Sequence, residues 1–474
     1  MFEIQVDKQS NHPIYQTLYT QIRNQIRSGK IINGSKLPSI RALQIELNIS
    51  KTPIETAYQM LIAEGYVVSK PKSGLYVVNL ETNTNGNIGN KNEISKSVQS
   101  DLANNKEKKK NMIDFNPTHI DNSIFPIRIW NKMVKEALEN HEFEIGRYGD
   151  PQGELSLREL LCDYLFNARG VNCSPDQIFI GNGIVNSINI ISKLLQDRGS
   201  IAIEDPGYIL ARNQFLLNEW HVTPIPVNES GLMVEKLECH SIDAVYVTPS
   251  HQFPTGSIIS YTKRERLLNW ASKHNAFIIE DDYDSEFRYK GKPISSLQGL
   301  DSLGRVIYIG TFSKVFTPAL RINYMVLPIT LLDKMKEISS EINSVPSRID
   351  QWAMSSFIEK GQFYRHIRKV RNVYRKKHHF LVETIREHLG RYVEIKGEYA
   401  GIHLQLVIKT HQSVYILIEK AELYGVMVHH FQNMWMDENK EEFPTLYMGF
   451  AALSEKEMEK GILLLKEAWR PLFK

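Results

Sequence analysis

The sequence predicts an α/β multidomain protein in which a small basic helical domain precedes a large domain built on a mainly parallel sheet. The chain has 474 residues, more than the roughly 250–300 that a single hydrophobic core usually organises. A polar stretch at residues 79–112 is dominated by Asn, Lys and Ser and cannot form a core. After it, short apolar runs alternate with helical stretches, which is typical of parallel sheets that helices cover on both faces. We therefore expect domains at residues 1–78 and 113–474, joined by a flexible linker at residues 79–112.

The composition excludes several classes of protein. With 42% hydrophobic and 23% charged residues, the chain has the balance of a soluble globular protein, which excludes wholesale disorder. It contains no run of about 18 apolar residues that could span a membrane, and its N-terminus lacks the apolar core of a signal peptide. We expect a cytoplasmic protein without a metal site, in which Cys162, Cys173 and Cys239 are reduced packing residues.

The positive charge is concentrated at the N-terminus. Residues 1–78 contain nine Lys/Arg and five Asp/Glu, a surplus of four positive charges, although the net charge of the whole chain is only +3. An excess confined to one end is expected if only that end meets a polyanion such as nucleic acid.

Residues 1–78 predict three helices followed by a β-hairpin. Apolar residues recur every four positions in residues 14–26, which indicates an amphipathic helix with Pro13 in its first turn. Ser39 and Ser50 stand where N-cap residues are preferred, each ahead of a further stretch with helical apolar spacing. Residues 66–78 predict two short apolar strands around a Lys-Pro-Lys-Ser-Gly turn, the pattern of a small basic wing.

The third predicted helix leaves Lys51, Thr52 and Thr56 facing outward at its N-terminal end. A helix presented in this way fits the major groove of DNA, which is roughly 12 Å wide. Arg41 on the second helix and the lysines of the wing would hold the phosphate backbone. The alternative is a small protein-interaction module whose surface charges are ordinary.

The N-terminal domain contains short motifs at Leu37–Arg41, Ser50–Ile54, Ala57–Tyr58, Leu61, Glu64–Tyr66 and Gly74. They resemble the GntR family of bacterial winged helix-turn-helix repressors. The resemblance covers almost all of residues 10–78 and implies binding to double-stranded DNA. Lys51 stands where the family usually has Arg, and Lys keeps the charge but loses the bidentate fork that reads guanine, so the resemblance carries over DNA binding more than it carries over an operator sequence. Pro53 stands where Thr or Ser is usual. The candidate DNA-contacting residues are Ser39, Arg41, Lys51, Thr52, Thr56, Lys70, Lys72 and Gly74.

In the large domain, polar residues close successive apolar runs. Six such runs occur between residues 177 and 328, each of strand length and separated by helical stretches. Ligands gather beyond the carboxyl ends of parallel strands, so these polar residues are where we expect chemistry. They include Gly181–Gly183, Asp205–Tyr208, Thr248–Ser250, Asp281–Tyr283 and Thr311–Lys314.

Several of these residues suggest a bound ring with a phosphate tail. Lys314 could form a Schiff base with an aldehyde, and Asp281 could pair with a pyridine nitrogen and keep it protonated. Tyr208 could stack on the ring. Taken singly, each residue has an ordinary explanation, such as a solvated lysine or a capping aspartate, but their position on one rim favours the ligand. The candidate phosphate-binding groups are Thr311, Ser313, Arg321 and the backbone amides at Gly183 and Ile184.

The large domain contains further motifs at Tyr148–Gly153, Glu204–Tyr208, Pro249–Gly256, Glu280–Tyr289 and Ser313–Lys314 with Pro318 and Arg321. Over about residues 113–474 they resemble the fold-type I pyridoxal-phosphate enzymes, in particular class I and II aminotransferases. The resemblance implies that the cofactor is pyridoxal 5'-phosphate and that Lys314 forms the internal aldimine. It also implies that Asp281 pairs with the ring nitrogen, Tyr283 donates to the ring oxygen and Tyr208 stacks on the ring.

The same resemblance implies a dimer. Ser313 and Arg321 would hold the phosphate, and Tyr148 would reach the phosphate of the neighbouring subunit. A GntR-type reader joined by a long linker to an aminotransferase-like domain resembles the MocR subfamily of transcriptional regulators, across nearly the whole chain. In that subfamily, pyridoxal phosphate and an amine or amino-acid ligand act as effectors that alter DNA binding, and dimers are commonly head-to-tail.

Two residues depart from the aminotransferase pattern. Phe253 stands where Asn usually lies beside the ring oxygen, and Tyr447 stands where an Arg usually clamps the substrate carboxylate. A hydroxyl cannot replace a bidentate guanidinium on a carboxylate. We therefore expect a ligand other than an α-amino acid held in the ordinary way, or pyridoxal phosphate itself as the effector. Arg212 is a candidate carboxylate partner, and the adjacent His429 and His430 are expected to be structural.

The sequence predicts a pyridoxal-phosphate-dependent, DNA-binding transcriptional regulator that senses an amine, an amino acid or the cofactor itself through Lys314. Sensing requires only reversible chemistry at that lysine, so little catalytic turnover is expected. Two alternatives stay open. One is a transaminase with a vestigial DNA-binding domain, and the other is a scaffold whose cofactor site is dead.

Overall fold

The structure is a computed structural model of the chain. It divides into two compact units, Met1–Asp101 and Leu102–Lys474, and each is considered by itself. Residues 79–111, nearly all of the expected linker, and the candidate DNA contact Lys72 lie outside the described residues. The structure describes residues 4, 13–71, 73–78, 112–289, 295–339, 341, 345–436 and 442–473.

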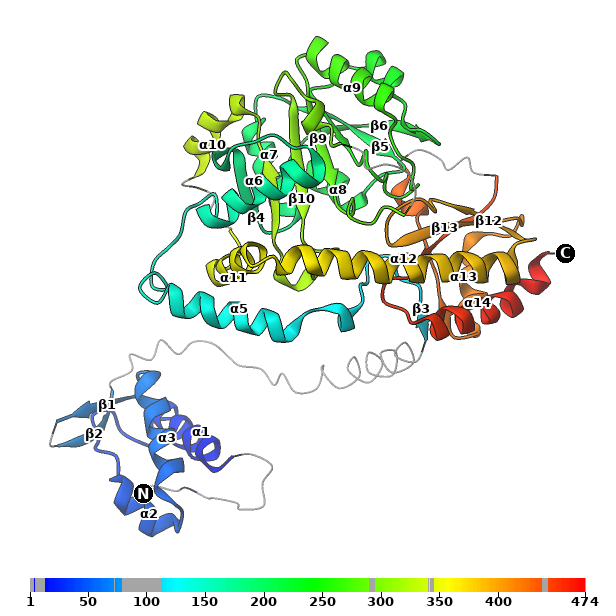
Figure 1. Cartoon of the computed structure of the whole chain (residues 1–474). Coiled ribbons are helices and arrows are strands. Elements are labelled where there is room, and N and C mark those ends of the chain that lie inside the picture. The colour runs from blue at the N-terminus through cyan, green and yellow to red at the C-terminus, as the bar shows by residue number, and fades with distance from the viewer. Residues whose placement is uncertain are drawn as a thin grey trace. The chain divides into compact units, whose positions relative to one another are not determined.

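The small unit has three helices followed by a hairpin, as the apolar spacing predicts (Figure 1). Val67 pairs with Val77 across the antiparallel hairpin, and both are buried against the helices. The core of this unit is made by the apolar faces of all three helices. The elements are α1 (Ile14–Arg27), α2 (Ile40–Leu47), α3 (Lys51–Ala63), β1 (Val67–Lys70) and β2 (Gly74–Val77).

Two details at the helix starts differ from the prediction. Pro13 is the N-cap of α1 and lies outside its first turn. Ser39 caps α2, because its hydroxyl accepts a hydrogen bond from the backbone N–H of Ala42 at 3.1 Å. Ser50 holds the N-cap position of α3, but its side chain makes no capping hydrogen bond. The position of a cap was therefore predicted correctly in both helices, and its hydrogen bond in only one.

The large unit is built on an eight-stranded sheet with the order β4-β11-β10-β9-β8-β5-β6-β7. The pairs from β10 through β9, β8 and β5 to β6 are parallel, whereas β11 runs antiparallel to both of its neighbours. All six predicted apolar runs are strands of this sheet. The strands are β4 (Ile178–Gly181), β5 (Ser200–Asp205), β6 (His221–Asn228), β7 (Gly231–Leu232), β8 (Ala244–Val247), β9 (Phe277–Asp282), β10 (Val306–Thr311) and β11 (Asn323–Val326).

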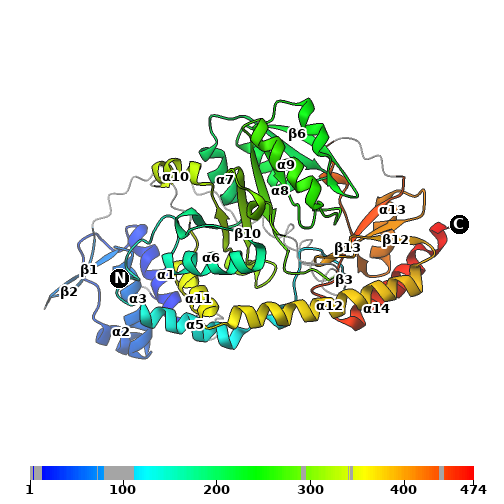
Figure 2. The same cartoon turned by 45° about the horizontal axis from the view of Figure 1, so that its top comes forward.

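Helices cover both faces of this sheet (Figures 1 and 2). Successive residues of a strand point to opposite faces, so Ile279 of β9 packs with α7, α8 and α10 while Ile278 packs with α9. The face that carries Tyr308 of β10 is covered by α5, α6, α11 and α12. These helices are α5 (Ile127–Asn140), α6 (Leu155–Arg169), α7 (Ile184–Leu194), α8 (Ile209–Leu217), α9 (Tyr261–Lys273), α10 (Leu332–Ser339), α11 (Arg348–Glu359) and α12 (Gln362–Leu389).

A second, smaller sheet follows α12 in the chain. Its antiparallel strands have the order β12-β13-β16-β15, and Tyr447 lies in β16. A separate two-residue pairing joins β14 to β3 in parallel. The elements are β3 (Ile113–Asp114), β12 (Val393–Lys396), β13 (His403–Ile408), α13 (Val414–Leu423), β14 (Val426–Met427), β15 (His429–His430), β16 (Thr445–Gly449) and α14 (Glu455–Trp469).

The three cysteines are free thiols. Cys162 of α6 and Cys173 are partly buried, and their sulfur atoms lie 3.8 Å apart, closer than their separation in the sequence suggested. Within the described ranges, none of the helices combines the length and the apolar character that crossing a bilayer requires.

Candidate cofactor cleft and DNA-binding surface

The carboxyl end of β9 places a buried carboxylate, Asp281, on the sheet face that α7 and α8 cover. The hydroxyl of Tyr246 on β8 donates a hydrogen bond to Asp281 Oδ2. Burial raises the pKa of Asp281 to about 7, although the Tyr246 hydrogen bond acts in the opposite direction. A positively charged ring nitrogen would relieve this cost of burial, because an opposite charge favours the ionised form. Sequence reasoning missed Tyr246, whose only signal is a polar tip inside an apolar strand.

Asp282, the next residue of β9, lies on the other face of the sheet. Its Oδ2 accepts hydrogen bonds at 2.6 Å from Arg169 Nε and at 2.6 Å from the hydroxyl of Tyr308. Arg169 also donates to the hydroxyl of Ser250 at 2.7 Å. Asp282 is therefore part of a buried ion pair that joins β9 to the end of α6.

Lys314 lies three residues beyond the end of β10 and is half-buried. Its Nζ donates to the backbone oxygen of Thr118 at 3.4 Å. Burial lowers the pKa of Lys314, and the nearby carboxylate of Asp284 partly offsets this effect. A lowered pKa increases the fraction of neutral amine, which is the form that attacks an aldehyde. In the parallel pairing of β10 with β9, Ile309 is opposite Asp281. Asp281, near the end of β9, and Lys314, beyond the end of β10, therefore lie at the same edge of the sheet.

Tyr283 belongs to a polar cluster beside Asp281. Its hydroxyl lies 3.1 Å from His251 Nδ1, which is also 2.8 Å from Asp284 Oδ2. His251 and Asp284 are both buried. The Nε2 atom of His251 has no hydrogen-bond partner in the described part of the chain. Sequence reasoning assigned no role to His251, although it stands in a motif that carried the resemblance.

The predicted phosphate-binding residues meet where β4 and β10 end and β11 begins. Thr311 of β10 is opposite Asn323 of β11, which is opposite Gly181 of β4. Ser313 lies two residues beyond Thr311, and the two hydroxyl oxygens are 3.0 Å apart. The backbone N–H of Ser313 donates to the Thr311 hydroxyl at 3.1 Å. The structure therefore brings Thr311 and Ser313 into one hydroxyl-rich corner.

Gly183 and Arg321 complete this corner. Gly183 has φ +86°, and a Cβ on it would lie 2.3 Å from Arg321 Nη2, so only glycine lets the guanidinium approach this closely. The Gly183 N–H already donates to the Asn323 side chain at 2.8 Å. Ile184 begins α7, whose N-terminal end carries a partial positive charge that favours an anion. Of the two predicted amides, Ile184 is thus better placed to meet a phosphate.

Ring-bearing side chains pack together at the candidate cofactor site in a cluster that we call the aromatic wall and define as Tyr208, Phe253, Tyr283, His403 and Tyr447. Phe253 is at its centre. It meets Tyr208 edge-to-face with ring centroids 5.6 Å apart, and it meets Tyr283 and His403 in the same way at 6.0 and 5.8 Å. Its ring stacks on that of Tyr447 at 5.9 Å with an interplanar angle of 13°. Burial raises the pKa of Tyr208 to about 12, so its hydroxyl stays protonated.

The two residues expected near a ligand carboxylate are engaged elsewhere. Tyr447 is buried, and its hydroxyl donates to Met434 Sδ at 3.3 Å. The guanidinium of Arg212 donates to the backbone oxygens of Asn433, Met434 and Trp435 at 3.2 to 3.5 Å. These contacts occupy the guanidinium of Arg212 and disfavour it as a carboxylate partner.

His429 has the structural setting that its sequence context predicted. Its Nε2 lies 2.7 Å from Asp114 Oδ1. The Nδ1 atom of its neighbour His430 accepts a hydrogen bond from the backbone of Gln432 at 3.2 Å. His429 therefore joins β15 to β3, whereas His430 holds the backbone two residues further along the chain.

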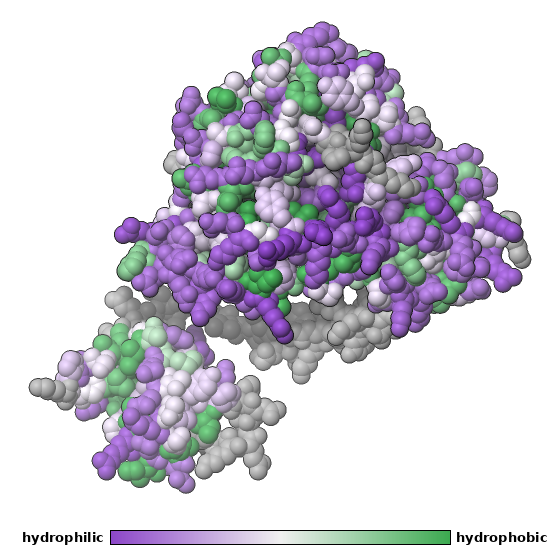
Figure 3. Space-filling view, in the orientation of Figure 1, coloured by the Kyte–Doolittle hydropathy of each residue, from purple (hydrophilic) through white to green (hydrophobic). Residues whose placement is uncertain are grey.

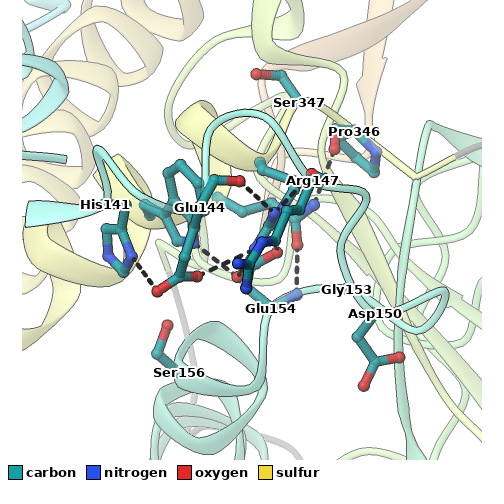
Figure 4. A network of polar contacts seen from close by, with 12 residues as sticks. His141, Glu144, Arg147, Asp150, Gly153, Glu154, Ser156, Pro346 and Ser347 are labelled. Carbon is teal, nitrogen blue, oxygen red and sulfur yellow. Dashed lines mark hydrogen bonds and ion pairs between the residues drawn. The ribbon is translucent and has the colours of Figure 1, made fainter. Parts of the chain in front are cut away.

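Tyr148 is fully exposed, on a loop that Arg348 anchors. Figure 4 shows the polar contacts that gather around Glu144, Arg147 and Glu154 of this region. Arg348 Nη1 donates to the backbone oxygens of Glu144 and Arg147 at 3.0 and 2.8 Å. Its Nε donates to Glu154 Oε1 at 2.6 Å. This network holds the loop on both sides of Tyr148, whose side chain is exposed to solvent.

The small unit presents most of its predicted DNA contacts at the surface. Arg41, Lys51, Thr52 and Lys70 are exposed. Lys51 forms an exposed ion pair with Glu55 at 2.7 Å, and its ammonium group has further donors for a phosphate.

Three other predicted contacts have local roles in the small unit. The Thr56 hydroxyl donates to the backbone oxygen of Thr52 at 3.0 Å, and the Ser39 hydroxyl caps α2. Gly74 has φ +119°, and a Cβ there would lie 2.8 Å from the side chain of Lys36. Lys36 is an exposed lysine beside the wing that sequence reasoning missed.

Known proteins match both units. Residues 116–462 match the aminotransferase class I and II family, and residues 14–77 match the gntR family of bacterial regulatory proteins. The probable rhizopine catabolism regulatory protein MocR of Rhizobium meliloti is 31% identical over 474 residues, which covers 98% of this chain and 96% of that one. The chain belongs to the MocR subfamily of GntR-type transcriptional regulators.

Other similarities agree with this MocR-type architecture. The uncharacterized HTH-type transcriptional regulator YdeL of Bacillus subtilis is 40% identical over 458 residues, 97% of each chain. A Pyrococcus horikoshii kynurenine aminotransferase, solved in complex with PMP, is 25% identical with a TM-score of 0.70 and covers 81% of this chain and 96% of that one. The predicted fold, a winged helix-turn-helix followed by a fold-type I aminotransferase-like domain, is confirmed.

Proposed function

We propose that this MocR-subfamily protein is a pyridoxal-phosphate-dependent transcriptional regulator. Residues 1–78 would bind double-stranded promoter DNA in the cytoplasm, residues 79–112 would serve as the linker, and residues 113–474 would hold the cofactor. The observation that supports the proposal most is that two neighbouring parallel strands, β9 and β10, bring the buried carboxylate of Asp281 and the amine of Lys314, whose pKa is lowered, to the same edge of the sheet.

The residues present have the chemistry that pyridoxal phosphate requires. Asp281 would hold the ring nitrogen in its protonated form, and Tyr246 would keep that carboxylate oriented. Tyr208 would lie against the ring, and Tyr283 would donate to the ring oxygen. When bound, the cofactor supplies an aldehyde that bonds reversibly to a primary amine, here that of Lys314. The phosphate would be held by Thr311, Ser313, Arg321 and the α7 terminus at Gly183 and Ile184.

Regulation is favoured over catalytic turnover because the candidate site lacks an arginine that is free to bind a substrate carboxylate. Tyr447 is buried in the position where an arginine would grip a substrate, and Arg212 is engaged with backbone oxygens. A regulator needs only the exchange of one amine for another at the cofactor, which requires no such grip. The second candidate function, transamination, would need a rate of product formation that this cleft does not favour.

A direct test compares the wild type with Lys314→Ala. We expect the purified wild type to show the visible absorption of bound pyridoxal phosphate and to protect its target promoter from nuclease in a cofactor-dependent way. Lys314→Ala should lose the absorption band and the response to cofactor, while binding to the isolated operator persists through the small unit. Unchanged absorption in Lys314→Ala would contradict the role of this lysine, and enzyme-like rates of transamination would favour the second candidate.

The aromatic wall favours a particular class of effector. Its rings offer apolar surface, and an aromatic pair contributes about 1 kcal/mol beyond the burial of its area. They offer no guanidinium to a carboxylate. The effector would therefore be a primary amine on an apolar or aromatic body without an α-carboxylate. The alternative is that pyridoxal phosphate itself is the effector.

Spectral titration with matched pairs of compounds tests the effector class. Phenethylamine and phenylalanine differ only in the α-carboxylate, so the amine should shift the visible spectrum at lower concentration. Tyr447→Arg should reverse the preference, because a guanidinium would then meet the carboxylate. If phenylalanine is as effective as phenethylamine in the wild type, the proposed effector class is wrong, although the cofactor proposal stands.

We also propose a homodimer, in a head-to-tail arrangement, in which Tyr148 of one subunit completes the phosphate site of the other. The anchored loop and the solvent exposure of Tyr148 support this arrangement. Tyr148→Phe should weaken pyridoxal-phosphate binding several-fold while the dimer persists in analytical ultracentrifugation. A monomeric wild type at micromolar concentration would contradict the proposal.

A further inference from the structure

The large unit contains a cavity of about 600 Å³ whose lining excludes every predicted cofactor residue. The end of α6 forms one side, with Tyr164 and Arg169. The other side is a stripe along α12 from Tyr364 to Arg375. Figures 1 and 2 both show α6 next to α12. A volume of this size lies within the range of about 300–1,000 Å³ that small-molecule sites occupy.

Positive charge dominates the lining of this cavity. Among the described residues that line it, four are arginines and one, Glu286, is acidic. Arg368, Arg371 and Arg375 follow one another at intervals of three and four residues, so a single face of α12 directs them to the same place. Figure 3 shows strongly hydrophilic side chains over this part of the surface.

The three arginines of α12 have no carboxylate partner among the described residues. Arg371 Nε donates to the backbone oxygen of Glu286 at 2.8 Å, and Arg375 Nη2 donates to the Asn372 side chain at 3.3 Å. These neutral acceptors orient the guanidinium groups without neutralising them. The three side chains are exposed, so solvent screens their mutual repulsion to a few tenths of a kcal/mol per pair, and a bound anion would reduce it further.

The opposite side of the cavity is already satisfied. Glu286 Oε1 accepts a hydrogen bond from the hydroxyl of Tyr164 at 2.8 Å, and Arg169 Nε is paired with Asp282 at 2.6 Å. Tyr364 and Ile367 add an aromatic ring and an apolar side chain to the lining. The cavity therefore combines unneutralised cations on α12 with a fixed floor and some apolar surface.

We propose that this cavity binds a small organic molecule that carries two or more anionic groups, either phosphates or carboxylates. The planar guanidinium fork of arginine matches both groups in a bidentate geometry. Three arginines on consecutive turns span more than one anionic group, which favours a multivalent ligand over a single inorganic ion. The cavity is a second ligand site, outside the cleft of Lys314 and Asp281.

The test uses two probes, inorganic pyrophosphate and citrate, which are titrated into the cofactor-loaded full-length protein by calorimetry at fixed ionic strength. The test variant is Arg368→Ala/Arg371→Ala/Arg375→Ala. The control variant, Arg365→Ala/Lys369→Ala/Lys376→Ala, removes the same charge from the same helix at exposed positions that do not line the cavity. Retained visible absorption of the cofactor in both variants shows that the fold and the cofactor cleft are intact.

We expect the wild type to bind at least one probe and the control variant to bind it with the same affinity. The test variant should bind about tenfold more weakly for each arginine that contributes, as expected for lost charge-assisted hydrogen bonds. Binding of pyrophosphate alone would identify a phosphate-bearing ligand, and binding of citrate alone would identify a polycarboxylate. If the triple variant does not fold, Arg368→Ala, which removes an exposed side chain, replaces it.

Two outcomes would overturn the proposal. The first is that neither probe binds the wild type at millimolar concentration. If promoter DNA binding then depends on Arg368, Arg371 and Arg375 but not on the control positions, the arginines form a nucleic-acid contact. The second is that the control variant loses affinity to the same extent, which would indicate nonspecific attraction by the helix. None of these outcomes bears on Lys314 or on cofactor binding, so the proposed function stands or falls separately.

Discussion

Two adjacent aspartates at the end of β9 lie on opposite faces of the sheet and have different partners. We call the face of Asp282 the structural face and the face of Asp281 the ligand face. Asp282 faces α6 and accepts hydrogen bonds from Arg169 and Tyr308, at 2.6 Å each. Asp281 faces α7 and α8 and accepts the Tyr246 hydroxyl, with no cation among its described contacts. A buried carboxylate that is paired with a cation contributes to the fold. A buried carboxylate without a cation has a raised pKa, and a positively charged ligand would stabilise its ionised form.

The largest expected effect is the loss of stability when Asp282, on the structural face, is replaced. Asp282→Asn removes the charge that pairs with Arg169 Nε, and breaking a buried pair from one side costs about 3–5 kcal/mol. Asp281→Asn removes an equally buried carboxylate that has no cation and whose pKa burial raises to about 7, so it should raise the free energy of unfolding at pH 7 and not lower it. Urea denaturation of the cofactor-free proteins measures both. Similar losses in the two variants would mean that the faces do not differ.

The next effect concerns pH and the ligand face. The pKa of Asp281 is about 7 in the fold, against a usual value of 3.8, so the folded state binds more protons than the unfolded state between these limits. Stability gained from Asp281 is therefore fully present below pH 3.8 and is lost as pH rises through 7. Between pH 5 and pH 8 this loss is about 2.5 kcal/mol for the cofactor-free protein.

Asp281→Asn isolates that contribution. Burial also raises the pKa values of Glu204, Glu280 and Glu286 to about 7, so the variant should still lose stability as pH rises, but less steeply than the wild type. Urea midpoints at pH 5, 6, 7 and 8 in both proteins give the difference. Equal slopes in the two proteins would show that Asp281 is not the titrating group.

The reactive residues on this rim were predictable from sequence because the chain itself places them. Lys314 and Asp281 each close an apolar run, and parallel strands end at one edge of a sheet. Their partners were not predictable in the same way, since Tyr246 and Arg169 meet these carboxylates only through the register of β8 and the end of α6. The strand β6 was missed because Pro224 and Pro226 interrupt a run that otherwise pairs along β5.

The arginine-lined cavity was also not predictable from the sequence, because the segments that form it are far apart in the chain. Its two sides come from α6 and α12, which are about two hundred residues apart in the chain. The arginine spacing on α12 is visible in the sequence, but by itself it is typical of a solvated helix face. Only the packing of α6 against it turns that face into the wall of a cavity.

A third prediction tests the hydrogen bond between Tyr308 and Asp282 on the structural face. Tyr308→Phe removes the hydroxyl that donates to Asp282 and leaves the ring in place. Hydrogen bonds to charged groups contribute about 1.5–3 kcal/mol, so the free energy of unfolding should fall by about 2 kcal/mol at pH 7. The affinity for pyridoxal phosphate should stay within a factor of two of the wild type, because Asp282 does not face the cofactor cleft. A large loss of cofactor affinity would show that the two faces are coupled.

The matching prediction on the ligand face is Tyr246→Phe, and it has the smallest expected effect on stability. At pH 6 most of the Asp281 carboxyl is protonated, so loss of the hydroxyl should change the free energy of unfolding by less than about 1 kcal/mol. The Tyr246 hydrogen bond lowers the pKa of Asp281, so its loss raises that pKa and makes the carboxylate harder to ionise for a ring nitrogen. Pyridoxal phosphate should then bind about tenfold more weakly at pH 7, or about 1.4 kcal/mol, with the difference from the wild type shrinking as pH rises. Titration of cofactor absorption across pH 6 to 9 measures this, and a pH-independent loss of affinity would mean that Tyr246 acts through shape and not through the charge of Asp281.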